Sequence, residues 1–511
     1  MKHIITGSEM KQIDKHTIQT IGIPSLVLME RVALSVADEI SKDYESGSKI
    51  CCVCGVGNNG ADGVAVSRIL MNRGFETFIY IVGNKEKATE DFLKQLSVHN
   101  NIDGNIVSDF EKFKKNKFDL IVDAVFGVGL SRPVGGIFGE VIDFINDNYN
   151  DIYSVDIPSG IDADTGMKLN TAIRAAKTIT FGCNKTGLLF NDGKDYAGQV
   201  IVADIGFPIT LFDNSPNSYY SLEEADFSLI PVRKENSNKG SYGKILVVAG
   251  NDSMSGAAFI CAKAALRMGS GMVKVFTTIH NEEYIRNNLP EAMVTTYSTD
   301  DQAESVIKKV EEDIKWCDTV VAGPGIGLGD LQTNIIRTIL KKEGIKIVLD
   351  ADAINNISFN ESLKDALKSN NNQIVITPHI GEMSKFTGLS VSEIKNNHIN
   401  VAKQFAGSYG ITIIMKDSVT TVTDGNKVYI NTSGNSGMAT AGSGDVLAGI
   451  TAAMVSKNMD FCIAGALAAY IHGIAGDLAS EKTSPSYMIA TDIIEQLADI
   501  TKTIDRKNIK S

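Results

Sequence analysis

The chain of 511 residues suggests about two to three domains, and 43% of its residues are hydrophobic, which is enough to give each domain a core. Its 49 Lys and Arg residues against 61 Asp and Glu residues leave a net charge of −12, which disfavours nucleic acid as the main partner. The same composition excludes disordered and fibrous classes. The sequence predicts a soluble globular protein.

We expect neither a targeting segment nor a membrane-spanning segment. Polar residues appear within the first ten positions, so the apolar region of a signal peptide is missing. The best candidate span, residues 464–479, contains His472 and Asp477 and falls short of a bilayer crossing. Seven cysteines are an odd and sparse set, which indicates reduced thiols rather than disulfides. We therefore expect a cytoplasmic protein without membrane contact.

Apolar runs rich in β-forming residues recur along the first half, with helical stretches between them. This alternation is typical of a mostly parallel sheet covered by helices on both faces. It predicts an α/β domain of three layers with Rossmann-like architecture. The runs are Ile50–Cys54, Thr77–Val82, Leu120–Val125, Ile152–Asp156, Thr178–Phe181 and Val200–Asp204.

A second α/β series follows and predicts a second core. Near its end, residues 419–423 and 427–430 alternate around Asp424 and Gly425, which predicts an antiparallel hairpin at the sheet edge. The two series share an architecture class but no motifs, so we expect a fusion of two α/β domains rather than a repeat. The runs are Lys244–Ala249, Val273–Thr277, Thr319–Ala322, Ile345–Asp350, Gln373–Thr377 and Ile411–Met415.

The α/β pattern lapses between about residues 208 and 238, where polar and turn-forming residues gather. We place the domain boundary there. The predicted division is a first domain over residues 1–212, a linker over 213–235 and a second domain over 236–505.

A glycine-rich loop, GVGNNGADG at residues 55–63, follows the first predicted strand. Its glycines let backbone amides approach an anion at the start of the next helix. It matches the dinucleotide fingerprint only weakly, because the second strand ends at Val82 to Asn84 without the acidic residue that holds a ribose. The loop is either a structural turn or, as we favour, a ligand loop in which Asp62 and backbone amides recognise polar groups.

Two more polar clusters follow predicted strands, at residues 123–130 (DAVFGVGL) and 156–162 (DIPSGID). Open α/β sheets bind ligands at the carboxyl ends of their strands, so these clusters should converge with the glycine loop. Their amide, carboxylate and hydroxyl oxygens suit either a hydrogen-bonded site or a hard cation. The absence of Cys and His from the clusters argues against a transition metal.

These motifs, with residues 23–31 (IPSLVLMER) before them and 195–198 (DYAG) after them, resemble the NAD(P)H-hydrate epimerases over about residues 5–208. The resemblance implies that Asp156 is the catalytic acid/base. It also implies a potassium ion held by Asn59, Asp123 and Ser159. The implied contacts to the hydrated dinucleotide are Asn58, Asn59, Gly60, Ala61 and Asp62, and Gly127, Val128, Gly129, Leu130, Ser131, Arg132 and Pro133.

The role of Asp156 is chemically reasonable. Epimerising a hemiaminal-like carbon requires ring opening, or loss and return of water, with a group that moves protons. The alternative is that Asp156 only caps the turn that follows it. Ala61 stands where the family usually has a second glycine, and its methyl group would crowd a ligand if that position needed a positive φ.

The strongest motif in the chain is the small-residue segment 434–450, GNSGMATAGSGDVLAGI. Small residues leave the backbone amides open, and a helix from about Asp445 adds its positive end, so a phosphoryl group can be stabilised there. A carboxylate at that position suggests a base aimed at a hydroxyl nucleophile next to the phosphate, with a helix cap as the alternative. No Walker A motif occurs, so the chain is not a P-loop enzyme.

Further segments complete a second resemblance, to the ADP- or ATP-dependent NAD(P)H-hydrate dehydratases of ribokinase-like fold, over about residues 236–500. They are 239–244 (KGSYGK), 256–258 (GAA), 290–293 (PEAM), 322–327 (AGPGIG), 349–353 (LDADA), 377–382 (TPHIGE), 416–420 (KDSVT) and 489–492 (IATD). The resemblance implies a hydrated nicotinamide near Ala257, Gly325, His379 and Asp445. It places the nucleotide on Lys416, Asp417, Ser418, Val419 and Thr420, and on Ala441, Gly442, Ser443 and Gly444.

Together the two halves are similar to the bifunctional NAD(P)H-hydrate repair enzymes. The implied first reaction interconverts the R and S hydrates of NADH and NADPH. The implied second reaction uses ADP, with magnesium, to convert the S hydrate into NAD(P)H, AMP and phosphate. In that reaction Asp445 assists phosphorylation of the hydrate hydroxyl, and phosphate then leaves more easily than hydroxide would. Asp417 stands where the family commonly has a glycine. A homo-oligomer is also expected.

Two alternatives remain open at the level of sequence. The second half could be a kinase of a small alcohol, because the segment 442–445 (GSGD) is shared across ribokinase-like folds. The first half could be a noncatalytic binding module. His379 could also be a structural histidine rather than a substrate contact.

Overall fold

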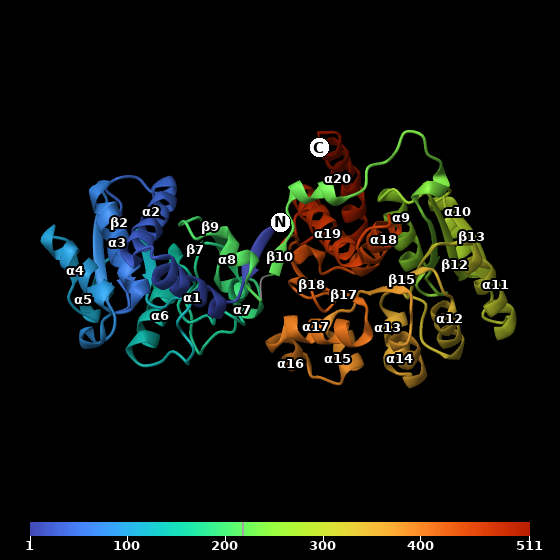
Figure 1. Cartoon of the computed structure of the whole chain (residues 1–511), viewed down its shortest axis with the longest axis horizontal. Helices are drawn as coiled ribbons and strands as arrows, with labels where there is room; N and C mark the ends of the chain where they lie inside the picture. Colours follow the sequence, from blue (N-terminus) through green and yellow to red (C-terminus); the bar gives the residue numbers. More distant parts are fainter. Residues whose placement is uncertain (217–218, 511) are drawn as a thin grey trace. The chain divides into compact units, whose positions relative to one another are not determined.

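The computed structural model describes residues 1–216 and 219–510, and the chain divides into two units (Figure 1). The N-terminal unit comprises His3–Tyr219. The C-terminal unit begins at Tyr220 and includes Met1–Lys2. The prediction of two α/β folds is confirmed, and each unit has its own buried clusters.

A parallel sheet of order β4-β3-β2-β5-β6-β7-β9 forms the centre of the N-terminal unit. A separate short parallel pair joins β1 to β8. The strand bounds are β1 Lys2–Ile5, β2 Lys49–Cys54, β3 Glu76–Ile81, β4 Asn105–Val107, β5 Leu120–Ala124, β6 Ile152–Val155, β7 Lys177–Phe181, β8 Asn184–Lys185 and β9 Gln199–Ala203.

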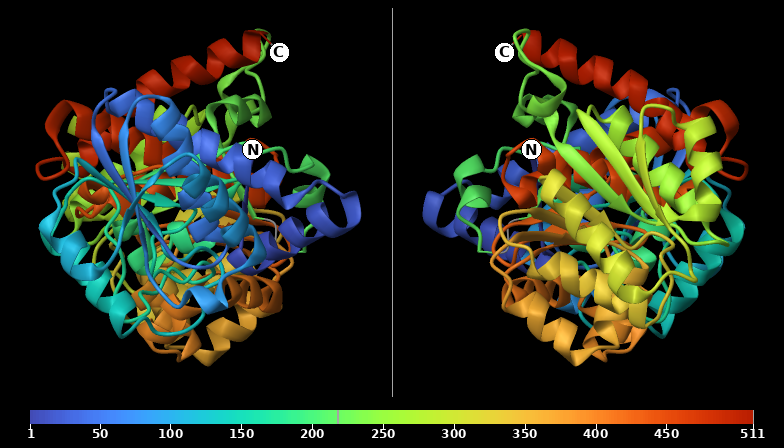
Figure 2. Two further views of the ribbon diagram at one scale, coloured as in Figure 1. Left: turned by 90° about the vertical axis from the view of Figure 1, so that its left-hand side faces the viewer. Right: turned by 90° about the vertical axis from the view of Figure 1, so that its right-hand side faces the viewer.

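Helices cover both faces of this sheet, because its central strands are apolar on both sides. Residues of α2 and α3 pack with one face, and residues of α5 and α6 pack with the other (Figure 2, left). The bounds are α1 Gly7–His16, η1 Thr17–Ile21, α2 Ser25–Asp43, α3 Asn58–Asn72, η2 Lys85–Lys87, α4 Glu90–Asn101, α5 Phe110–Lys115, α6 Ile137–Asn148, η3 Thr186–Leu188, α7 Asn191–Tyr196 and α8 Ile209–Asp213.

The C-terminal unit is built on strands in the order β13-β12-β11-β14-β15-β16-β17-β18-β19-β10. The pairs from β13 to β17 are parallel, and β17, β18 and β19 pair antiparallel, as the predicted hairpin requires. The bounds are β10 Tyr219–Ser221, β11 Lys244–Val248, β12 Met272–Thr278, β13 Met293–Tyr297, β14 Thr319–Ala322, β15 Lys346–Leu349, β16 Gln373–Ile376, β17 Thr412–Met415, β18 Thr420–Thr423 and β19 Val428–Asn431.

The faces of this second sheet carry two groups of helices (Figure 1; Figure 2, right). α9, α18, α19 and α20 share one buried cluster, and α11 to α15 with α17 share another. The bounds are η4 Glu224–Leu229, η5 Lys239–Tyr242, α9 Ser255–Arg267, η6 Ile279–Asn281, α10 Glu282–Asn288, α11 Ala303–Trp316, α12 Asp330–Lys341, α13 Asp352–Ser358, α14 Glu361–Lys368, α15 Ile380–Thr387, α16 Val391–Asn396, α17 His398–Tyr409, η7 Ser436–Met438, α18 Ser443–Ser456, α19 Phe461–Thr483 and α20 Ala490–Lys510.

Among the described residues, α19 alone is long and apolar enough to cross a membrane. Two thirds of its most apolar window (67%) is buried inside the C-terminal unit, where α19 packs against α18 and α20. Its hydrophobicity is that of a core helix, which is apolar around its whole circumference because it is enclosed by protein.

The segment 213–235, predicted as a linker, is partly ordered structure. Tyr220 of β10 pairs in parallel with Tyr429 of β19, so this strand lies beyond the predicted edge hairpin. Phe227 of η4 is buried in the core of the C-terminal unit. Residues 217–218 of the predicted linker lie outside the described part of the chain. The sequence did not predict these elements, because each is only a few residues long and lies in a polar segment.

The start of α3 is pressed against the end of β2. A Cβ atom on Gly60 would lie 1.8 Å from the carbonyl oxygen of Gly55, so this approach requires glycine. The neighbouring Ala61 is helical with an ordinary negative φ, and its side chain is fully buried in the N-terminal core. Its methyl group therefore does not crowd a ligand.

Gly60→Ala should destabilise the N-terminal unit by about 2–3 kcal/mol, because the added methyl group meets backbone that cannot move aside easily. Gly57→Ala is the matched control: nothing lies within 4 Å of a Cβ there, and φ is −94°, so the cost should stay below about 1 kcal/mol. Urea unfolding followed by circular dichroism measures the difference. The single tryptophan, Trp316, lies in the C-terminal unit and should report an unchanged transition. Equal stabilities of the two variants would contradict the clash.

Candidate active sites

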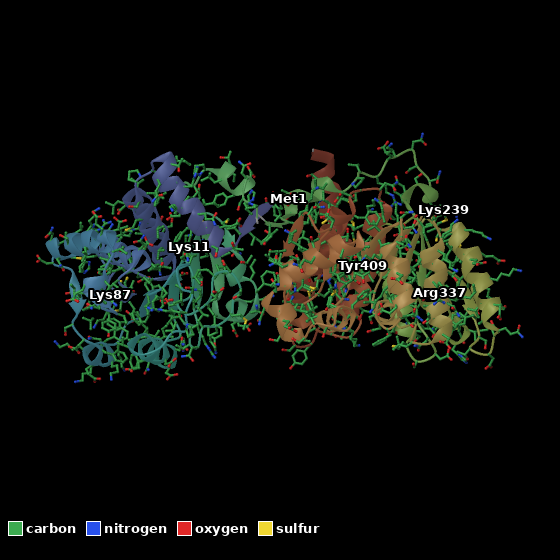
Figure 3. All side chains as sticks on the ribbon, turned by 60° about the horizontal axis from the view of Figure 1, so that its bottom comes forward. Met1, Lys11, Lys87, Lys239, Arg337 and Tyr409 are labelled. Carbon is green, nitrogen blue, oxygen red and sulfur yellow. The ribbon has the colours of Figure 1, made fainter. Side chains whose placement is uncertain are left out.

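A cavity of about 870 Å³ opens at the carboxyl ends of the N-terminal strands. Ten of the predicted site residues line it: Asn58, Asn59, Asp62, Gly127, Val128, Gly129, Leu130, Ser131, Arg132 and Asp156. Gly60, Ala61 and Pro133 do not line the cavity, and neither do Asp123 and Ser159. Figure 3 labels two further lining residues, Lys11 and Lys87.

Asp156 follows β6 and is held in an unusual backbone conformation, with φ of +71°. Its Oδ1 accepts hydrogen bonds from Lys185 Nζ (2.9 Å) and from Thr180 Oγ1 (3.1 Å). The Lys185 side chain is 1% exposed, whereas that of Asp156 is 14% exposed and reaches the cavity. A non-glycine residue with positive φ stores backbone strain, which is typical of functional sites. The ion pair directs the carboxylate and supplies its compensating charge.

Two other carboxyl groups in this cavity have raised pKa values. Burial raises the pKa of Asp62 well above its ordinary value, and the negative charges of Asp156, Asp14 and Asp91 raise it further. Burial and then the charge of Asp156 also raise the pKa of Asp14. The displacement follows because ionised carboxylates repel one another where water cannot screen them. The cavity thus combines an ion-paired carboxylate, Asp156, with two carboxyl groups whose pKa is raised.

Asp123 and Ser159 lie beneath the cavity wall and are fully buried. Asp123 Oδ1 accepts a hydrogen bond from Ser159 Oγ (2.6 Å), and Oδ2 accepts bonds from Ser154 Oγ (2.8 Å) and Ser159 N (2.8 Å). Burial raises the pKa of Asp123, and these hydrogen bonds oppose that rise. The Nδ2 atom of the nearby Asn59 is buried without a hydrogen-bond partner. Asn59 lies against Gly127, in the second polar cluster.

In the C-terminal unit, the site centres on a buried lysine among carboxylates. Lys416 Nζ lies 2.8 Å from Asp350 Oδ1, which also accepts a 2.5 Å hydrogen bond from Thr377 Oγ1. Burial lowers the pKa of Lys416, but the charges of Asp350, Glu382 and Asp445 outweigh it, so the pKa is raised overall. The lysine is therefore a permanent cation, and its side chain is 21% exposed.

Asp445 lies in the first turn of α18 beside this cation. A Cβ on its neighbour Gly444 would lie 3.2 Å from Lys416 Nζ. Burial and the charge of Asp350 raise the pKa of Asp445 to about 7, against the attraction of Lys416. Such a carboxyl group exchanges its proton near neutral pH, which is the property that a general base needs.

The amino end of α18 is open to an anion. Its N-cap is Gly442, with φ of +88°, so no side chain occupies the first amides of the helix. A Cβ at Gly442 would meet Ile260 Cδ1 at 2.8 Å. Close by, burial lowers the pKa of His472 to about 4, and its Nε2 lies 3.3 Å from Ser443 Oγ. A neutral histidine fixes Ser443, and the positive charge at the helix start comes from the backbone and Lys416.

The glycine turn after β14 brings two predicted substrate contacts together. A Cβ on Gly325, whose φ is +63°, would lie 3.0 Å from Ala257 Cβ. The same turn passes over Asp350, since a Cβ on Gly323 would lie 1.7 Å from the Asp350 carbonyl oxygen. Asp352 completes the contact by accepting a 2.9 Å hydrogen bond from Gly327 N. The turn thus connects Ala257 and Gly325 to Asp350, which pairs with Lys416.

His379 has a structural function that its sequence position did not reveal. Its Nδ1 accepts a hydrogen bond from Gly381 N (2.9 Å), and Glu382 Oε2 accepts one from His379 N (2.9 Å), which together cap α15. The ring still reaches solvent, with 58% of the side chain exposed. Glu382 is buried, which raises its pKa, and the Lys416 charge opposes that rise. His379 therefore adjoins the Lys416 cluster through Glu382.

The residues predicted to bind the nucleotide differ in their exposure to solvent. Asp417 and Ser418 are exposed, and Asp417 lies 4.0 Å from Lys395 Nζ. The side chain of Val419 is 4% exposed and belongs to the core, so only its backbone could contact a ligand. Thr420 begins β18, and Ala441 is exposed ahead of α18.

Sequence reasoning gave no role to several residues that the structure brings into the sites. Asp350, Asp352 and Glu382 were visible only as acids after predicted strands, a signal that could have assigned them. Asp14 and Lys185 had no motif, because they reach the first cavity from α1 and from the end of β8.

Comparison with known proteins decides the family. Two family models match: "YjeF-related protein N-terminus" over residues 25–187 and "NAD(P)H-hydrate dehydratase" over residues 245–499. The bifunctional NAD(P)H-hydrate repair enzyme of Moorella thermoacetica is 31% identical over 99% of this chain and 98% of its own length. The chain belongs to the bifunctional NAD(P)H-hydrate repair enzymes. The predicted family and the predicted pair of activities are confirmed.

A second relative and a solved structure are also similar to this chain. The Escherichia coli enzyme is 30% identical over 97% of this chain and 93% of its own length. A solved structure of a hypothetical protein from Streptococcus mutans is 26% identical, covers 56% of this chain and all of its own chain, and has a TM-score of 0.50. Because the relatives match across both units, the chain is a bifunctional repair enzyme with two enzymatic units, rather than a small-alcohol kinase with an attached binding module.

Asp445→Asn should stabilise the C-terminal unit, and more so at high pH. The folded pKa of about 7 exceeds the unfolded value of 3.8, so the folded state binds more protons and wild-type stability falls as pH rises from about 4 to 7. The uncharged variant escapes this loss, which is on the order of 2–4 kcal/mol above pH 7. Denaturant midpoints from Trp316 fluorescence at pH 4 and pH 8 measure the gap between variant and wild type. A gap of equal size at both pH values would contradict the assigned acidity.

Proposed function

We propose that the C-terminal unit dehydrates the S hydrate of NADH or NADPH with ADP, and that Asp445 is its catalytic base. The observation that supports this proposal most directly is the position of Asp445, at the open start of α18 beside Lys416. Its pKa is raised to about 7. ADP would lie across residues 416–420 and 441–444, and the hydrated nicotinamide would lie near Ala257, Gly325 and His379. The α18 amides would stabilise the phosphoryl group in transfer.

In the first step, the hydroxyl oxygen of the hydrate attacks the β-phosphorus of ADP while Asp445 accepts the hydroxyl proton. The bond to the α-phosphate oxygen breaks and AMP leaves. In the second step, the ring nitrogen lone pair expels phosphate from the carbon, and the adjacent carbon loses a proton to the departing phosphate, which restores the dihydropyridine. Lys416 lies where it can offset the charge of both phosphate species, because its ammonium adjoins Gly444.

Magnesium would be held mainly through the nucleotide. No group of three or more His, Cys, Asp or Glu side chains suited to a metal occurs in the described parts of the chain. Magnesium commonly binds one or two carboxylates together with substrate phosphates and water, and Asp350 and Asp352 could supply those carboxylates. When bound, the ion would neutralise charge on the phosphates.

For the N-terminal unit, we propose that the cavity binds the hydrated dinucleotide and that Asp156 moves protons during epimerisation. Asn58, Asn59 and Asp62 would contact the substrate from α3, and residues 127–133 from the opposite loop. The ion pair with Lys185 supports a carboxylate that is ready to accept a proton.

Asn59, Asp123 and Ser159 fit a potassium ion as this site's occupant. The set offers one carboxylate with neutral hydroxyl and amide oxygens, which is a donor set for a hard cation of low charge. Asn59 has a buried amide nitrogen without a partner, and reversing that amide would present its oxygen instead. A bound cation would fix the loops that carry Asn59 and Ser159.

We also propose that the enzyme works in the cytoplasm, since all seven cysteines are free and buried, as expected for a reducing compartment. Self-association and the absence of nucleic-acid and membrane partners stay predictions.

Asp445→Asn should lower the rate of ADP-dependent dehydration of the S hydrate by about 10²–10⁴-fold, because the amide cannot accept the proton. Wild-type kcat/KM should rise with pH up to about 7 and then level, since the base works only when ionised. Formation of reduced-nicotinamide absorbance measures the rate. Asp499→Asn on α20, an exposed carboxylate, is the control and should match wild type. This mechanism would be contradicted if Asp445→Asn dehydrated the S hydrate at the wild-type rate, or if a stable phosphorylated product formed without NADH.

Asp156→Asn should reduce consumption of the R hydrate to the spontaneous epimerisation rate while leaving consumption of the S hydrate unchanged. The reason is that only the R hydrate must pass through the N-terminal site before dehydration. Separate progress curves with R and S hydrate, plus excess ADP, measure both. Asp195→Asn, an exposed carboxylate on α7, should behave as wild type. If Asp156→Asn still uses both hydrates at wild-type rates, Asp156 has no part in epimerisation.

A further inference from the structure

Four carboxyl groups and four cations line the epimerase cavity, but one of those cations alone is buried. Asp14, Asp62, Asp91 and Asp156 all line it, and Lys185 is its buried cation. The other lining cations, Lys11, Lys87 and Arg132, are exposed. Burial and the charges of neighbouring carboxylates disfavour ionisation, and they raise the pKa of Asp62 and of Asp14.

Lys185 is fully committed to the neighbourhood of Asp156. Its ammonium group has three protons, and it donates to Asp156 Oδ1 (2.9 Å), Thr180 Oγ1 (2.6 Å) and the Phe181 carbonyl oxygen (2.8 Å). No donor remains for a second carboxylate. Asp91, in turn, accepts a 2.8 Å hydrogen bond from Ser25 Oγ and lies 3.6 Å from Lys94 Nζ.

Asp62 differs from both of these residues. Within the described parts of the chain, its carboxyl group accepts no hydrogen bond and forms no ion pair. It projects into the cavity from the second turn of α3, and the approach of Gly60 to Gly55 fixes that helix in place. Burial and the charges of Asp156, Asp14 and Asp91 raise its pKa well above the ordinary value. Asp62 is thus a carboxyl group without a hydrogen-bond partner among the described residues, in the same cavity as the ion-paired Asp156.

Epimerisation by ring opening needs these two kinds of group at once. The hydroxyl of the hydrated carbon must lose a proton, and the ring nitrogen must gain one. A single carboxylate would have to serve both atoms in turn, whereas an acid and a base can serve both in one step.

We propose that Asp62 is a second catalytic residue of the epimerase, the general acid that complements Asp156. This inference rests on the proposed function of the N-terminal unit. Asp156 takes the hydroxyl proton, the oxygen electrons form a C=O bond, the C–N bond breaks, and its electron pair takes the proton of Asp62. After rotation of the aldehyde, the nitrogen attacks the other face, its proton returns to Asp62, and the new alkoxide takes the proton from Asp156. No atoms or electrons are gained or lost.

The test compares Asp62→Asn with Asp147→Asn, which removes an exposed carboxylate of α6 that does not line the cavity. Epimerase rates are measured by adding purified R hydrate and following R and S forms chromatographically, with the spontaneous rate subtracted. Dehydration of purified S hydrate by the same preparations normalises for folded enzyme. Asp62→Asn should lower epimerase kcat by at least about 100-fold with KM changed by less than about 3-fold, whereas Asp147→Asn should keep the wild-type kcat and KM.

The pH profile supplies a readout that a binding role would not change. Wild-type epimerase kcat should fall at high pH as the acid loses its proton, and Asp62→Asn should lose that alkaline decline. A raised KM with unchanged kcat, or a retained alkaline decline, would overturn the proposal. The proposal would also be overturned if Asp14→Asn, and not Asp62→Asn, lowered kcat and abolished the alkaline decline. If wild type itself shows no epimerisation above the spontaneous rate, the proposed function fails instead, which is a distinct result.

Discussion

The compensation of a buried carboxylate by a single lysine is the interaction on which both sites depend. In the N-terminal unit Lys185 pairs with Asp156, and in the C-terminal unit Lys416 pairs with Asp350. Each aspartate follows a parallel strand of its own sheet. Parallel strands end together, so acids placed after them gather in space, and a cation is then needed to keep one of them ionised. Neighbouring acids without such a cation are displaced toward their protonated forms.

This arrangement divides the acids into distinct chemical roles. Asp156 and Asp350 are fixed by their lysines, whereas burial raises the pKa of both Asp62 and Asp445, in Asp445 to about 7. One fold therefore provides both a held charge and a mobile proton within a small volume. The two units reached this division with different motifs, which agrees with their origin as a fusion rather than a repeat.

Much of the architecture could be predicted, because apolar runs with period and spacing typical of α/β sheets mark strands buried on both faces. The predicted ends of the central strands lie within one or two residues of the observed ends. The strands β1, β4, β8, β10 and β13 were missed, since two to five residues with partly polar composition carry no usable pattern. The site motifs 57–63, 123–130 and 442–445 were visible because glycines and acids cluster after strands. Lys185 and Asp14 could not be found, because their function arises from contacts between distant segments. His379 could not be separated from a cap, since both functions place a polar side chain after a strand.

The left-handed backbone of Asp156 limits what evolution can place there. Asparagine and glycine adopt that conformation at little cost, whereas alanine, leucine or a β-branched residue would strain the turn. A lineage that dispensed with epimerisation, for example because its cells tolerate the spontaneous rate, would therefore drift first to Asn or Gly at this position. Such a substitution in a descendant sequence would record lost chemistry with a preserved fold.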